Sequence, residues 1–204
     1  QEQLFWLLKI LGHTMADAAE GEMPMIPESL LALSSAVQPP EADPLVVASE
    51  KVLEYANLES KLIRAGRIDH TLSPFVAETL VWFLQRWSLS YLMPNETYYA
   101  RISVRLWEAF GEKTKSGIQA LELVIDKACA NILDWPHSFE VAENTAILLY
   151  EMLKSTKIRV ALPRVKSWWK LLDAYNKADN SIMRLLPPTL SKLVQAMCHA
   201  LAEG

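Results

Sequence analysis

Cysteine and glycine are both scarce in this sequence. The 204 residues include two cysteines, Cys129 and Cys198, and six glycines. Both cysteines fall within apolar helical patterns, where a free cysteine usually acts as a small buried hydrophobic residue, so we expect a reducing compartment and no disulfide. So few glycines leave little turn chemistry for hairpins or phosphate-binding loops, and this favours a nearly all-helical protein.

Long hydrophobic runs and an excess of positive charge are also missing. No stretch of about 18 apolar residues lacks a charge, since Lys9, Arg86 and Asp126 interrupt the longest candidates, so we expect no membrane span. The 20 basic and 24 acidic residues give a net charge of −4, unlike the basic surface of a general nucleic-acid binder. The opening residues 1–3 carry neither an initiator methionine nor a basic region. We therefore expect no signal peptide and an internal fragment of a longer chain.

Apolar residues instead recur every three or four positions along most of the chain, which is typical of amphipathic helices. With 51% apolar and 22% charged residues, the composition is that of a folded, water-soluble protein. The pattern predicts about nine helices, in these segments: Leu4 to a point before Gly21, Glu28 to Ala36, Leu45 to Ala65, Ser73 to Met93, Asn95 to Phe110, Gly117 to Leu133, Ser138 to Leu153, Val165 to Lys177, and Pro187 to Leu201.

Consecutive helices joined by short turns are expected to form antiparallel pairs. The pairs near 75–110, 117–153 and 165–201 repeat about every 40 to 47 residues, which is the period of HEAT-type repeats. We therefore predict an all-α fold in which antiparallel helix pairs stack as a HEAT-repeat-like right-handed superhelix, an α–α solenoid. Residues 1–204 form a single such segment, with residues 37–44 as a proline-rich, exposed internal linker. A closed helical bundle stays open as an alternative, because the pairs share no residue-level identity.

No pattern typical of catalysis or metal binding occurs in the sequence. The stretch from Gly111 to Gly117 places Lys-Ser before the second glycine, the reverse of a phosphate-binding loop, and no strand precedes it. There is no Cys-x-x-Cys and no Gly-x-Ser-x-Gly turn. The histidines are scattered: His13, His70, His137 and His199. We expect no enzymatic activity, no cofactor and no metal.

Seven tryptophans and one basic stretch stand out from the average composition. We expect the tryptophans to pack in the core rather than to form stacking platforms for bases. The basic residues form either a solvated rim or a surface for an acidic partner. They are Lys154, Lys157, Arg159, Arg164, Lys166 and Lys170.

Several strings of residues, taken in order, resemble one family of nuclear export receptors. They are Leu4-Phe5-Trp6-Leu7 with Gly12-His13, Glu20-Gly21-Glu22, Pro24-Met25-Ile26-Pro27, Val81-Trp82-Phe83-Leu84-Gln85-Arg86-Trp87 followed by Tyr91-Leu92, Phe110-Gly111, and Trp168-Trp169-Lys170-Leu171. These strings are similar in type and order to the middle of the exportin-4 family, within the importin-beta superfamily. The resemblance spans Leu4 to Leu201, and its most specific part is the string Trp82 to Trp87.

This resemblance implies a fragment of a transport receptor that binds protein cargo together with Ran-GTP and exports it through nuclear pores. The implied partners are Ran-GTP, nuclear pore proteins and a cargo such as a basic, hypusine-bearing translation factor, with no nucleic acid and no membrane. It also implies shuttling between nucleus and cytoplasm. A helical-repeat scaffold for other proteins, without a Ran cycle, stays open because a fold alone does not dictate function.

Three glutamates are candidates for contact with a basic cargo. Solenoids bind partners with their inner helices, where exposed acids attract cationic side chains. The candidates are Glu140, Glu143 and Glu151, all in the segment predicted as a helix from Ser138 to Leu153. The alternative, that they are helix-start and surface acids without a partner, also stays open.

Overall fold

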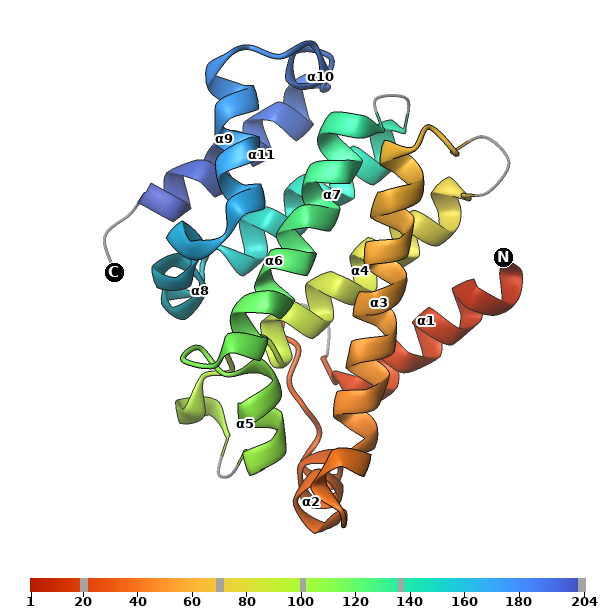
Figure 1. Ribbon diagram of the computed structural model, residues 1–204, viewed down its shortest axis with the longest axis vertical. Helices are drawn as coiled ribbons and strands as arrows, with labels where there is room; N and C mark the ends of the chain where they lie inside the picture. Colours follow the sequence, from red (N-terminus) through yellow and green to blue (C-terminus); the bar gives the residue numbers. More distant parts are fainter. Residues whose placement is uncertain (19–21, 69–71, 100–101, 136–137, 202–204) are drawn as a thin grey trace.

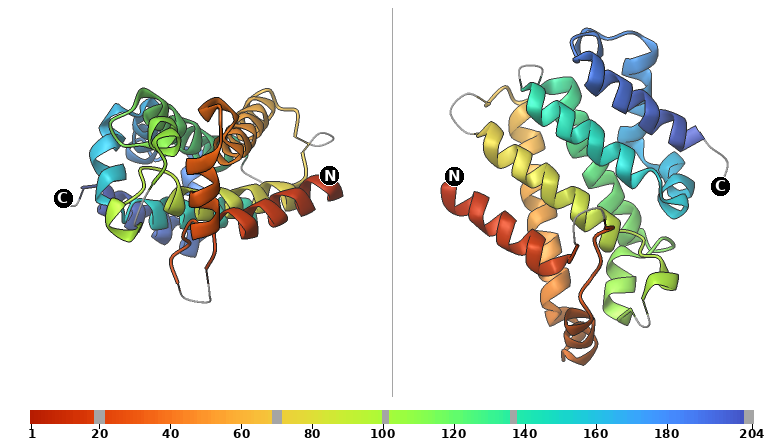
Figure 2. Two further views of the ribbon diagram at one scale, coloured as in Figure 1. Left: turned by 90° about the horizontal axis from the view of Figure 1, so that it is seen from below. Right: turned by 180° about the vertical axis from the view of Figure 1, so that it is seen from behind.

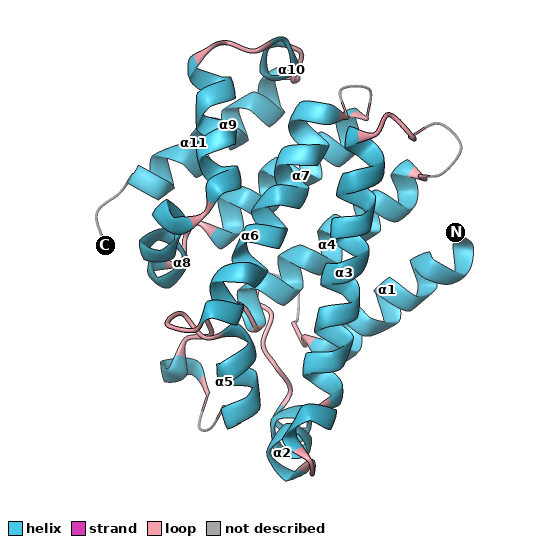
Figure 3. Ribbon diagram, in the orientation of Figure 1, coloured by secondary structure: helices cyan, strands magenta, loops and turns pink. Residues whose placement is uncertain are grey.

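The computed structural model describes residues 1–18, 22–68, 72–99, 102–135 and 138–201. Within these ranges the chain forms eleven α-helices and no β-strand, apart from one isolated antiparallel bridge between Asp17 and Met25, so the predicted all-α class is confirmed (Figure 3). The helices are α1 (Glu2–Met15), α2 (Glu28–Ala36), α3 (Pro44–Arg64), α4 (Pro74–Ser90), α5 (Val104–Phe110), α6 (Lys115–Cys129), α7 (Phe139–Met152), α8 (Thr156–Ala161), α9 (Lys166–Asn176), α10 (Asn180–Met183) and α11 (Pro187–Leu201).

The long helices lie in two layers (Figure 1). Helices α3, α6 and α9 form one layer, and α1, α4, α7 and α11 lie side by side in the other, which faces the viewer on the right of Figure 2. Along the chain, α3 is followed by α4, α6 by α7, and α9 by α11 through the short α10, so each pair places one helix in each layer. This alternation is that of a helical-repeat solenoid.

Most predicted helix ends agree with the structure, and α2 and α11 have the predicted bounds. Helix α3 ends in a Schellman motif, in which the N–H groups of Gly66 and Arg67 donate to the carbonyls of Ile63 and Leu62, each at 3.0 Å. Gly66 has φ +67°, a conformation that glycine adopts without a steric penalty. The first helix, α1, ends at Met15 and thus before Gly21, as predicted.

The predicted helix from Asn95 to Phe110 is wrong. Asn95 caps only a 3-10 turn, Glu96–Tyr98, and α5 begins anew where the Ser103 hydroxyl accepts the Leu106 N–H at 3.1 Å. These two caps interrupt the helix because each satisfies backbone donors locally. The predicted pairing of residues 75–110 is also wrong, since α5 packs on α2, α3 and α6 while α4 packs between α1 and α7.

The linker at residues 37–44 contains a 3-10 turn, Pro40–Ala42, and ends at Asp43. The Asp43 side chain is fully buried, accepts the Leu45 N–H at 2.9 Å and accepts a hydrogen bond from the Ser34 hydroxyl. Asp43 thereby caps the N-terminus of α3 and connects α2 to α3 through Ser34.

The tryptophans and cysteines only partly follow the expected burial. Trp87, Trp135 and Trp168 are buried, but Trp6 and Trp169 are each 55% exposed, so the core prediction is wrong for these two. Cys129 is buried and its thiol donates to a backbone carbonyl, and burial raises the pKa of this thiol to about 12. Cys198 is exposed, contrary to expectation, because it lies on the outward side of α11.

A fully buried ion pair joins α3 to α6, and its hydrogen-bond network extends to α7 in the other layer. Lys127 on α6 lies 2.5 Å from Glu59 on α3, and both side chains are 0% exposed. The Lys127 ammonium also donates to Asn131 at 2.5 Å, and the Asn131 amide donates to Thr145 on α7 at 3.0 Å. Asn131 reaches this position because α6 continues into a π-helical turn, Ala130–Asp134. Burial lowers the pKa of Lys127, and the Glu59 carboxylate counteracts that shift.

We predict that Glu59→Leu alone destabilises the protein by about 3–5 kcal/mol, because it leaves the Lys127 ammonium buried without its carboxylate. The double variant Glu59→Leu/Lys127→Met should recover most of that loss, since no uncompensated charge remains. Equilibrium urea unfolding of both variants measures the two free energies. As a control, Glu54→Leu removes the carboxylate of the exposed Lys51–Glu54 pair and should change stability by less than about 1 kcal/mol. A single variant no less stable than this control contradicts the prediction.

Candidate protein-binding surfaces

The three predicted glutamates all lie on α7. Glu140 and Glu143 are exposed in its first two turns, and Glu151 is half-buried in its last turn. Glu143 and Glu151 follow Glu140 by 3 and by 11 residues, so all three lie on one side of the helix. They span about 16 Å along the helix axis. Glu151 forms an ion pair of 2.7 Å with Lys154. Glu140 and Glu143 form no ion pair with any described residue.

A fourth acid, Glu78 on α4, lies near Glu140. Partial burial raises the pKa of Glu78, and the charge of Glu140 adds to this effect. The neighbouring α4 and α7 helices therefore bring Glu78, Glu140 and Glu143 to one region, which we call the acidic edge. Sequence reasoning missed Glu78 because only the packing of α4 on α7 shows which acid faces Glu140.

A groove of about 800 Å³ lies at the other end of α4 and α7. It is lined by the second half of α4, by the segments at residues 22–24 and 95–99, and by the junction of α7 with α8. Its apolar side chains include Leu89, Leu92 and Met93. Glu151 lines this groove and Glu140 and Glu143 do not, so the structure separates the predicted trio into two surfaces. The sequence alone could not predict this groove, because the residues that line it are scattered along the chain between Ala18 and Ile158.

Hydroxyl groups fix the wall that the connector between α1 and α2 forms. The Tyr91 hydroxyl donates to the Met15 carbonyl at 2.7 Å, and the Ser90 hydroxyl donates to the Pro24 carbonyl at 2.9 Å. The Tyr99 hydroxyl accepts the Ile26 N–H at 3.3 Å and donates to the Ser90 carbonyl at 3.2 Å. The bonds to Pro24 and Ile26 hold the connector against α4 and Tyr99, the bond to Met15 holds the end of α1, and the fourth joins Tyr99 to the C-terminal end of α4.

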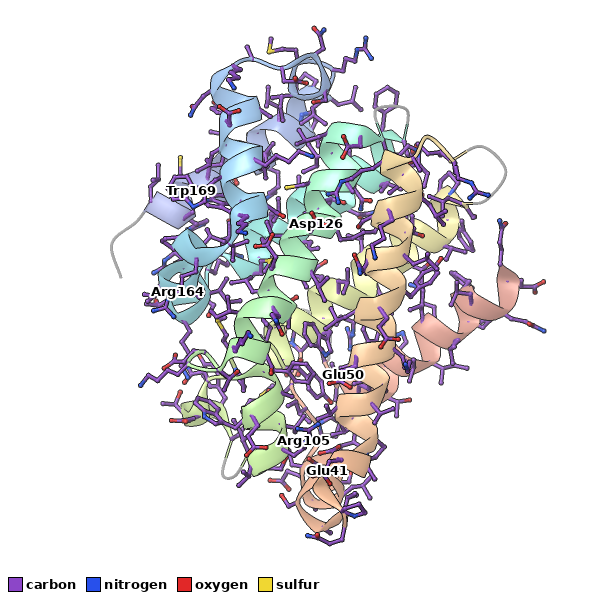
Figure 4. All side chains as sticks on the ribbon, in the orientation of Figure 1. Glu41, Glu50, Arg105, Asp126, Arg164 and Trp169 are labelled. Carbon is purple, nitrogen blue, oxygen red and sulfur yellow. The ribbon has the colours of Figure 1, made fainter. Side chains whose placement is uncertain are left out.

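Part of the predicted basic stretch also has structural partners. Lys157 donates to the Pro94 carbonyl at 2.9 Å, and Arg159 donates to the carbonyls of Leu153 and Lys154. Arg164 is exposed beside α8, as Figure 4 shows. The stretch is therefore not a uniform solvated rim, and its first residues form one side of the groove.

Charges on the other layer are paired across neighbouring helices. Arg64 on α3 forms two hydrogen bonds with the Asp126 carboxylate on α6, at 2.8 and 2.9 Å, and a third with Asp134 at 3.3 Å. Lys170 on α9 lies 3.7 Å from Asp134. Figure 4 shows Asp126 in the middle of this layer, between α3 and α9. These ion pairs join α3, α6 and α9.

No set of three or more His, Cys, Asp or Glu side chains in the described ranges is placed to hold a metal ion. His13 lies on α1 and His199 on α11, two helices that α4 and α7 separate, and His70 and His137 fall outside these ranges. None of the helices that the structure describes is long and apolar enough to cross a membrane.

Trp82 on α4 lies between the groove and α1. Gly12 of α1 lies so close to it that an added β-carbon would be 2.5 Å from a ring carbon of Trp82. Arg86 donates to the carbonyls of Gly12 at 3.2 Å and Ala16 at 2.5 Å, which caps the C-terminal end of α1. The glycine therefore permits the close approach of α1 to α4 that forms this side of the groove.

Comparison with known proteins identifies relatives. A sequence model of the family described as Exportin-4 matches residues 1–202. The chain is 27% identical over 197 residues to Exportin-4 of Dictyostelium discoideum, and this match covers 93% of the chain and 16% of that relative. The chain thus spans about one sixth of the length of the curated relative that it matches.

We predict that Gly12→Ala destabilises the protein by about 1–3 kcal/mol, because the added methyl group overlaps the Trp82 ring. In a Trp82→Leu background the same change should be neutral or stabilising by up to about 1 kcal/mol, since alanine is the better helix former. Urea unfolding of the four proteins gives the coupling between the two positions. Equal effects in both backgrounds contradict a close contact between Gly12 and Trp82.

Proposed function

Because the chain belongs to the Exportin-4 family, we propose that it is a segment of a nuclear transport receptor. The observation that carries this proposal is the family match, which extends over residues 1–202. The two-layer solenoid supports it, since stacked helix pairs offer long surfaces for protein partners.

Within the whole receptor, the proposed activity is export of a protein cargo bound together with Ran-GTP. The proposed partners are Ran-GTP, nuclear pore proteins and a basic cargo such as a hypusine-bearing translation factor. The receptor would move between nucleus and cytoplasm. No enzymatic step is part of this activity, because the receptor works by binding and release.

The acidic edge is the part of this chain that we propose to contact a basic cargo. Glu140 and Glu143 are exposed and form no ion pair in the described part of the chain, so their charges can act on an approaching cation. The proximity of Glu78 adds negative charge to the same region. Glu151 is a weaker candidate, because Lys154 compensates its charge at 2.7 Å.

The first test uses the full-length receptor that contains this segment. We expect it to capture cargo from nuclear and cytosolic extracts with Ran locked in the GTP form, and not with the GDP form or without Ran. Quantitative mass spectrometry of the captured proteins measures this difference. Cargo released by Ran-GTP would indicate import instead. Capture that is independent of Ran would favour a helical scaffold and contradict the proposal.

The second test reverses charges on the acidic edge. Glu140→Lys/Glu143→Lys in the full-length receptor should weaken capture of a basic cargo about threefold to tenfold at low salt, through a slower association rate. Glu151→Lys alone should have a smaller effect. Surface plasmon resonance with immobilised cargo measures these rates. Glu50→Lys/Glu54→Lys, an exposed pair on α3 in the other layer, is the control. Unchanged affinity of the α7 variant at low salt would exclude the acidic edge as a contact.

A further inference from the structure

Cations on both sides of the groove are held by aromatic rings. On the side of α1 and α4, the Lys9 ammonium lies 3.9 Å from the ring centroid of Trp82, and the Arg86 guanidinium lies 5.3 Å from it. These distances are those of cation–π interactions. Trp82 and Arg86 both line the groove.

A second cluster of this kind lies on the side of α7 and α11. The Lys154 and Lys192 ammonium groups lie 4.4 and 3.9 Å from the ring centroid of Tyr150. The His199 ring is 5.2 Å from the same ring. Lys154 lines the groove, and Lys192, which does not line it, contacts the same tyrosine ring as Lys154.

Few of these cations are neutralised by the described residues. Lys154 forms an ion pair with Glu151, but Lys9, Arg86 and Lys192 form none within 4 Å in the described ranges. Arg86 donates to the two carbonyls at the end of α1. The lining carries the cations Arg86, Lys154 and Lys157 and the acids Glu22 and Glu151. Lys9 and Lys192 add positive charge next to it, although the whole chain carries a net charge of −4. A negatively charged ligand can approach Lys9 or Lys192 without displacing a carboxylate.

We propose that this groove binds an acidic, partly hydrophobic peptide segment of a partner protein. Acidic side chains would contact the cations held by Trp82 and Tyr150, and apolar side chains would contact Met23 and Leu89, which line the groove and are not buried. The groove differs from the acidic edge in position and in the sign of its charge. The inference therefore goes beyond the proposed function and does not depend on Ran.

A peptide fits this site better than a nucleic acid. The faces of Trp82 and Tyr150 are covered by the protein's own cations, so they are not free to stack on bases. Glu151 in the lining also repels a phosphate backbone, whereas a peptide can place acids only where the cations lie.

Fluorescence anisotropy with this chain tests the proposal. The probe is a labelled peptide of about twelve residues that repeats the sequence Glu-Glu-Leu. We expect binding that weakens when salt is raised from about 50 to about 300 mM. A peptide with glutamine in place of every glutamate should bind at least about tenfold more weakly. Lys154→Gln/Lys192→Gln should weaken binding of the acidic peptide at least about fivefold, and Lys9→Gln about threefold.

The matched control is Lys51→Gln. Lys51 forms an i,i+3 pair with Glu54 on α3, as Lys154 does with Glu151, but in the other layer. It should leave binding unchanged, and circular dichroism of every variant should match the parent. The proposal is overturned if the acidic peptide does not bind, if the glutamine peptide binds equally well, or if Lys51→Gln weakens binding as much as the groove variants. Tighter binding of a twelve-nucleotide oligo-dT than of the acidic peptide would also overturn it.

Discussion

The burial of α4 is the constraint on which most of this structure depends. This helix packs between α1 and α7 and faces α3, so Leu80, Phe83, Leu84 and Trp87 are almost completely buried. Burial on so many sides requires that its polar atoms find partners within the protein. The Trp87 indole therefore donates to Ser49 of α3 at 2.9 Å, and Arg86 caps α1. Each of these hydrogen bonds connects a neighbouring element to α4. The need of the buried polar atoms of α4 for partners therefore also determines where the walls of the groove lie.

The direction of the helices determines where charge of each sign gathers. Acids are favoured near helix N-termini and cations near C-termini, because of the helix dipole. Glu140 follows this preference in the first turn of α7, whereas Glu78 lies in the second turn of α4, and Arg86 and Lys154 lie outside the last turns of α4 and α7. Because α4 and α7 run side by side in the same direction (Figure 2), Glu78 and Glu140 lie near the N-terminal ends of the two helices, and Arg86 and Lys154 lie near the C-terminal ends. One edge of the layer becomes acidic, and the groove at the opposite end becomes basic.

The sequence predicted those features that depend on neighbouring residues in the chain. The helices Glu28–Ala36 and Pro187–Leu201 have the expected bounds, and a proline marks the start of each, Pro27 just before the first and Pro187 at the beginning of the second. The six residues of α8 and the four of α10 are too short to show a period, and the caps at Asn95 and Ser103 override an apolar pattern that continues through them. The exposure of Glu140 could be predicted from the helix pattern. The proximity of Glu78 and the cation pair on Tyr150 could not, because they join residues of different helices.

Two surfaces of opposite charge on one layer impose different demands on partners. A basic partner is attracted to the acidic edge and repelled from the groove, whereas an acidic segment experiences the reverse. Screening by salt weakens both attractions, so ionic strength alone cannot separate them, but their residues do not overlap. A partner that carries a basic region and an acidic segment would therefore be oriented on this layer, with its charges placed along α4 and α7. This orientation of the partner depends on the parallel alignment of α4 and α7, which places the two surfaces at opposite ends of one layer. A partner would no longer be oriented in this way if the charges of either surface lay on the other layer.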